Sequence, residues 1–130
     1  MISLEMIAFT SKKQNYPLPA MKKLFGEKGD FIALVANSGC ALMLPQLSSS
    51  MGRNVPTKVL PVPLKGDVLA DVRLSDHSPF WDQGYNAMMI TDTSFLRNPH
   101  YHEPTDTVET LDLEFLYKVV EGIVESLSRL

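Results

Sequence analysis

Residues 31–37 have the sequence FIALVAN, six apolar residues followed by an asparagine. An unbroken aliphatic run of this length is typical of a strand that is buried on both faces of a sheet. Ser38 or Gly39 then opens a helical segment that extends to about Met51. A buried strand followed directly by a helix is the unit from which layered α/β folds are built.

The same alternation continues on both sides of this stretch. The pattern predicts three further strands, at residues 2–9, 59–62 and 87–91. It also predicts three further helical segments, at residues 21–25, 75–84 and 113–127. Prolines flank the strand at 59–62, which suits a strand end or a sheet edge. Together these segments predict an α/β fold, a layered α/β/α sheet with helices on both faces.

The last helix has the clearest pattern in the chain. Asp112 is the expected N-cap. Apolar residues then follow the i, i+3, i+4 spacing that predicts one buried helix face. They are Leu116, Val119, Val120, Ile123, Val124 and Leu127.

Composition excludes several classes of protein. The chain has 130 residues, 45% of them hydrophobic, and a formal net charge of -3, which fits one ordinary domain without affinity for nucleic acid. Its apolar runs are shorter than the roughly 18–20 residues that cross a bilayer. The single cysteine, Cys40, permits no internal disulfide and no thiolate zinc cluster, so we expect it to be a small buried residue.

Three groups of polar residues lie where long loops would meet at the sheet edge, the usual ligand-binding position of open α/β folds. The first is Glu5, which lies among apolar residues of the first strand. A carboxylate is costly to bury unless it is paired or binds a metal. An outward-facing position on a solvated strand explains Glu5 equally well.

The second and third groups also have simple structural explanations. Asp76 precedes an apolar stretch and would serve as a helix cap, and His77 fits a hydrogen-bonded structural histidine. His102 lies in a polar loop with Asp106 close behind it. Histidine is the commonest zinc ligand, but one loop histidine does not make a site.

Taken together, the motifs resemble the co-catalytic zinc aminopeptidases, the family of bacterial leucyl aminopeptidases with glutamate carboxypeptidase II and glutaminyl cyclases as more distant relatives. The resemblance spans the whole chain. Its opening segment, Ser3–Ile7, resembles the family's strand that ends in a metal-binding carboxylate. The later motifs are Ser75–Trp81, Ile90–Thr93, Arg97–Pro99, Tyr101-His102 and Thr105–Thr107.

The resemblance implies a hydrolase that removes amino-terminal residues from peptides with two zinc ions. Glu5 would be a ligand of one zinc and His102 a ligand of the other. The Tyr101 hydroxyl would steady the tetrahedral oxyanion. Asp76 would support the ligands from an outer position, and Asp106 would brace the His102 loop.

The chain also departs from the family pattern. The family's His-x-Asp and Glu-Glu motifs, which supply further ligands and the general base, have no counterpart here; in the family they precede the Glu5 strand. We therefore expect residues 1–130 to form a single partial domain, the carboxy-terminal half of a catalytic domain with the phosphorylase/hydrolase-like fold. If the chain begins inside a domain, the lack of a signal peptide at its amino terminus gives no information about the cellular compartment.

This interpretation predicts that the chain alone is inactive and binds zinc weakly. The alternative is a non-catalytic binding or assembly module descended from such an enzyme. A cyclase-like single-zinc site matches Glu5 and the Tyr101-His102 pair less well. A half-sheet leaves an uncovered face and an unpaired edge, so we also expect exposed apolar surface and self-association.

Overall fold

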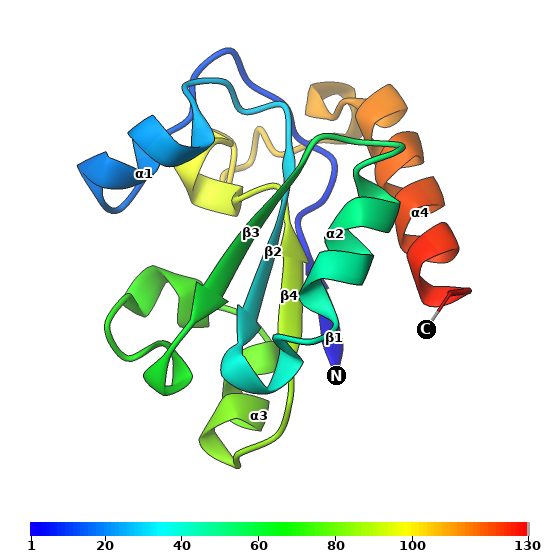
Figure 1. Cartoon of the computed structure of the whole chain (residues 1–130). Coiled ribbons are helices and arrows are strands. Elements are labelled where there is room, and N and C mark those ends of the chain that lie inside the picture. The colour runs from blue at the N-terminus through cyan, green and yellow to red at the C-terminus, as the bar shows by residue number, and fades with distance from the viewer. Residues whose placement is uncertain (130) are drawn as a thin grey trace.

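The computed structural model describes residues 1–129 and contains a four-stranded mixed sheet (Figure 1). The strands are β1 (Ile2–Glu5), β2 (Ile32–Asn37), β3 (Thr57–Val62) and β4 (Met88–Thr91). Their order in the sheet is β1-β4-β2-β3. The predicted α/β class is confirmed, and the strand flanked by prolines, β3, is an edge strand as expected.

Strand direction decides which loops meet. β1 pairs with β4 in parallel and β2 pairs with β3 in parallel, whereas β2 and β4 are antiparallel. The carboxyl ends of β1 and β4 therefore lie at the same edge as the amino ends of β2 and β3. The long connections 6–31 and 92–112 start from this edge, which makes it the place where a site can form.

Helices cover both faces of the sheet. On one face α2 (Leu44–Met51) and α4 (Leu113–Leu127) pack over a core that includes Leu34, Met88 and Ile90. Cys40 is buried in this core, as predicted. On the other face lie α1 (Pro19–Phe25), α3 (His77–Asp82) and a second core built around Val35 and Trp81.

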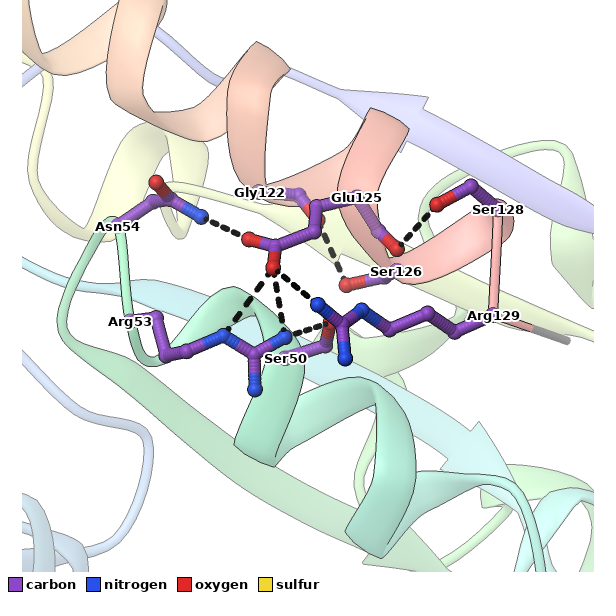
Figure 2. A network of polar contacts seen from close by, with 8 residues as sticks. All are labelled: Ser50, Arg53, Asn54, Gly122, Glu125, Ser126, Ser128 and Arg129. Carbon is purple, nitrogen blue, oxygen red and sulfur yellow. Dashed lines mark hydrogen bonds and ion pairs between the residues drawn. The ribbon is translucent and has the colours of Figure 1, made fainter.

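α2 and α4 lie side by side and are joined by close packing and by a polar network (Figures 1 and 2). A Cβ atom on Gly122 would lie 3.3 Å from the Met51 Cα, so the glycine permits this close approach. The Glu125 carboxylate accepts hydrogen bonds from Arg53, Asn54 and Arg129. These contacts fix how α4 is rotated on the core.

The predicted buried face of α4 is wrong in detail. The buried residues are Phe115, Val119, Gly122 and Ser126, which form a face of the right period turned toward α2. Val120, Val124 and Leu127, which were expected in the core, are 45%, 63% and 47% exposed. α4 is apolar over more than one face, so its periodicity alone did not identify the side that packs.

Several predicted boundaries differ from the structure, two of them by several residues. The first strand ends at Glu5 instead of continuing to residue 9, because Met6 has a φ of 46° and turns the chain out of the sheet. The segment from Ser38 begins as a 3₁₀ turn at Ser38–Cys40 and becomes α-helical at Leu44. No helix within residues 1–129 is long and apolar enough to cross a membrane.

Candidate active site

Glu5 stands at the carboxyl end of β1, opposite Thr91 at the end of β4. It is half-buried, and its Oε2 atom accepts a hydrogen bond from the Ser75 hydroxyl at 3.0 Å. The Ser75 and Ser3 hydroxyls lie 3.1 Å apart. Glu5 is therefore neither a freely solvated strand residue nor a fully buried carboxylate, but a partly buried one with a hydroxyl partner.

Glu5 borders a pocket of about 80 Å³ that opens at the same edge of the sheet. Its floor is the second sheet face, with Val35 and Met89. The walls come from both long connections and from the segment after β3. The apolar side chains that line it include Tyr16, Met21, Phe25, Phe31, Val59, Leu60, Leu69, Leu74, Phe95 and Leu96.

Tyr101 lines the same pocket as Glu5, and His102 lies directly beside Tyr101. The His102 ring stacks on the Tyr101 ring with 3.9 Å between centroids and 16° between planes. His102 has a φ of 59° and is exposed, whereas Tyr101 is half-buried and packs against Phe95. Glu5, Tyr101 and His102 are far apart in the sequence, and the fold places two of them in one pocket and the third beside it.

Asp76 and Asp106 lie on the surface. Asp76 directly precedes α3 without capping it through its side chain, and Ser75, one residue earlier, makes the contact with Glu5. The backbone N–H of Asp106 donates to the Glu103 carbonyl, and its carboxylate is exposed. Their supporting roles at the ligands remain predictions.

His77 has a structural environment. It is fully buried, its Nε2 atom lies 2.7 Å from the Val72 carbonyl oxygen, and its ring meets Trp81 edge-on at 4.4 Å. Burial lowers the pKa of His77 below its usual value, so the ring is neutral at pH 7. This agrees with the simple explanation that the sequence suggested.

Asp92 and Arg97 hold the two long connections together. Both lie in motifs that carry the family resemblance, but the sequence assigned neither of them a role. Asp92 is fully buried and accepts hydrogen bonds from the backbone N–H groups of Ala8, Phe9 and Ser94 at 3.1, 2.8 and 2.9 Å. Burial, the largest influence, raises the pKa of Asp92 above its ordinary value despite these three donors.

Arg97 also joins the two long connections through its guanidinium group. Its Nε atom donates to the Gln14 Oε1 atom at 2.8 Å, and its Nη1 atom donates to the Phe9 and Phe31 carbonyls at 3.2 and 2.9 Å. The guanidinium also lies over the Phe31 ring, 4.6 Å from its centroid. Burial lowers the pKa of Arg97 to about 10, which leaves it charged at pH 7. Arg97 thus fixes the pocket wall next to the loop that carries Tyr101 and His102.

Residues 1–129 do not bring together any group of three His, Cys, Asp or Glu side chains able to hold a metal ion. A catalytic zinc is normally held by about three protein ligands. Glu5 already has a hydroxyl partner, and His102 stacks on an aromatic ring at the surface. The side chains in the described part of the chain therefore do not fit a complete zinc site by themselves.

Comparisons with known proteins found similarity along nearly the whole chain. The model of a family described as peptidase family M28 matches residues 2–127. An uncharacterised Escherichia coli (strain K12) protein, YfbL, is 35% identical over 127 residues. That alignment covers 95% of this chain and 39% of the relative, so the chain spans about two-fifths of the relative's length. No solved structure matches.

Proposed function

The chain belongs to peptidase family M28, and from that premise we propose that it supplies one side of the active site of a zinc-dependent aminopeptidase. One observation carries the proposal. Glu5 and Tyr101 line a single apolar pocket at the sheet edge, and His102 stacks on Tyr101. A metal ligand and an oxyanion donor need this kind of convergence around one substrate position.

In the proposed site, Glu5 and His102 are ligands of two different zinc ions. The Tyr101 hydroxyl donates a hydrogen bond to the oxygen that becomes negative during peptide hydrolysis. Two ligands for two ions are too few for a stable centre. The described part of this chain does not bring further ligands together, so the proposed site requires ligands in addition to those grouped there.

The pocket indicates the class of substrate. Its walls are mainly aliphatic and aromatic, with Glu5, Lys58 and Asp71 also among the lining residues, so it favours a peptide whose amino-terminal side chain is large and apolar. Burying such a side chain contributes about 1.5–3 kcal/mol, whereas burying an unpaired charge is unfavourable. We expect leucyl and phenylalanyl substrates to be preferred over glutamyl and lysyl ones.

A second function is compatible with the incomplete ligand group. A pocket without three convergent ligands among the described residues fits a non-catalytic binding or assembly module equally well. The two functions differ in what Tyr101 and Glu5 do. In a peptidase they act on the reacting peptide bond, whereas in a binding module they only shape the pocket.

The test uses a chimera in which this chain replaces the matched segment of the Escherichia coli relative. Zinc-dependent hydrolysis of aminoacyl p-nitroanilides is measured for the relative and for the chimera. In an active chimera, Tyr101→Phe should lower kcat by about 100–1000-fold, the usual effect of losing an oxyanion donor. The matched control is Tyr85→Phe at a tyrosine that is 63% exposed and outside the pocket, and it should leave kcat unchanged.

Several results would contradict the peptidase proposal. The first is a zinc-loaded relative that hydrolyses none of these substrates. Another is an active chimera in which Tyr101→Phe and Glu5→Gln act no more strongly than Tyr85→Phe. Equal rates for leucyl and glutamyl substrates would contradict the assignment of the pocket.

A further inference from the structure

A row of four residues crosses the floor of the pocket at its open edge. The strands β1, β4, β2 and β3 lie side by side in this order (Figure 1), and each residue of the row is the register partner of the next. All four line the pocket, and we call them the outer row: Glu5, Thr91, Ala33 and Lys58. Only the two ends of the outer row are charged. Neighbouring strands lie about 4.8 Å apart, so three strand spacings separate the Cα atoms of Glu5 and Lys58 by about 14 Å.

A second row lies two residues deeper in the sheet and is apolar. Its members are register partners and line the same pocket, and we call them the inner row: Met89, Val35 and Leu60. Residues two apart on a strand point to the same face of a sheet. The outer row therefore lies at the mouth of the pocket, and the inner row lies beneath a side chain that enters it.

Lys58 has no anionic partner at its end of the outer row. It is half-buried, and its ammonium group makes no ion pair within residues 1–129. Asp71, a third charged residue of the lining, is not paired with it either. A charge that is partly removed from water is stabilised when a partner of opposite charge joins it. Among the described lining residues, Lys58 is the cation that an anionic group of a ligand would meet.

We propose that Lys58 binds the free terminal carboxylate of a short peptide whose main chain lies along the outer row. The inference rests on the proposed function, in which Glu5 marks the reacting end of the row. The amino end of the peptide then lies toward the Glu5 carboxylate and its carboxylate meets the Lys58 ammonium, so the charges of the ligand and of the row are complementary. The first side chain of the peptide enters over the inner row, which agrees with a large apolar residue at that position.

The length of the outer row selects the length of the peptide. Contacts at the two ends take up about 3 Å each. Of the separation of about 14 Å, roughly 8 Å then remains between the scissile carbonyl and the terminal carboxylate. An extended chain advances about 3.3–3.6 Å per residue, so about two residues follow the scissile bond. The ligand class is a tripeptide with a large apolar first residue and a free carboxyl terminus.

The experiment measures peptide binding to the metal-free chain by NMR titration. The probes are leucyl-glycyl-glycine and the same peptide with an amidated carboxyl terminus. The wild type should bind the acid about fivefold more tightly than the amide, the effect of one partly exposed ion pair. Lys58→Met should reduce this ratio to about one, and Lys58→Arg, which keeps the positive charge, should retain it. Lys13→Met is the matched control, because it removes the same charge from an exposed lysine outside the pocket and should retain the ratio.

Peptide length provides a second test of the geometry. The ratio of acid to amide affinity should be smaller for leucyl-glycine and for leucyl-tetraglycine than for the tripeptide, because their carboxylates fall short of Lys58 or beyond it. The proposal is overturned if no peptide shifts the resonances of the pocket, or if the wild type binds acid and amide equally. It is also overturned if Lys58→Met keeps the ratio as Lys13→Met does, since the lysine would then only protect an edge strand.

These outcomes are separate from those that test the peptidase proposal. Binding to the metal-free chain requires neither zinc nor turnover. A chimera that hydrolyses leucyl substrates but does not distinguish acid from amide would keep the proposed function and remove the role of Lys58. A preference for glutamyl over leucyl tripeptides that disappears in Lys58→Met would place Lys58 at the first side chain, and would also overturn the inference.

Discussion

Arg97 shows how a single side chain determines the shape of the candidate site. Its guanidinium joins the connection after β1, the residue directly before β2 and the loop that leads to Tyr101. Replacing it by lysine leaves one ammonium group for acceptors that lie in several directions. Buried carbonyls without a donor are costly, so Arg97→Lys should lower the free energy of unfolding by about 2–4 kcal/mol.

Urea unfolding checks this prediction against Arg53→Lys. Arg53 is an exposed arginine that binds Glu125, and its replacement should cost less than about 1 kcal/mol. If the two variants are equally stable, Arg97 does not hold the connections together in the way that its contacts indicate.

At the residue scale the sequence predicted part of the candidate site. It singled out Glu5, Tyr101 and His102 through a run of motifs, and the fold brings these residues to one pocket and its border. It missed Ser75 as the partner of Glu5 and Arg97 as the clamp. Their contacts join positions 70 and 83–88 residues apart, and no local pattern marks such pairs.

The helix α4 provides a prediction about pH. The Asp112 carboxylate accepts hydrogen bonds from the Phe115 N–H and from the Thr10 hydroxyl, and the bond from Phe115 is the main reason that its pKa is lowered. A group whose pKa is depressed by folding stabilises the fold above its unfolded pKa of about 4 and loses this contribution as pH falls through the folded pKa.

Two substitutions separate the cap from its charge. Asp112→Ala should lower the free energy of unfolding at pH 7 by about 1 kcal/mol, whereas Asp112→Asn keeps the cap and should cost little. Below about pH 4 the wild type should lose stability relative to Asp112→Asn, because only aspartate is protonated. An Asn variant whose unfolding follows the same acid profile as the wild type would show that the charge of Asp112 contributes nothing.

At the element scale the sequence predicted the types and order of the strands and helices better than their surfaces. The buried run of β2 and the cap of α4 both lie where they were expected. The buried face of α4 could not be assigned, because Leu113, Tyr117, Val120, Val124 and Leu127 form an apolar stripe as regular as the one that packs on α2. Only the position of α2 distinguishes the two faces.

At the scale of the whole molecule, the described residues form both cores and the pocket but do not form a complete set of metal ligands. Two cores cover both faces of the sheet, and the pocket is formed. The metal-binding group is not assembled within residues 1–129. The family and the α/β class could be predicted because motifs and hydrophobic patterns are local, whereas the completeness of a site depends on which segments meet in space.

The measurement that tests the account most directly is zinc calorimetry of the isolated chain, together with an assay of aminoacyl p-nitroanilide hydrolysis at saturating zinc. In the proposed site Glu5 and His102 bind different ions, so each ion would keep one protein ligand where about three are needed. Zinc binding should be weaker than micromolar, and hydrolysis should not exceed background. Zinc binding at micromolar affinity or tighter, with steady turnover by the purified chain, would contradict it and would require ligands other than those identified.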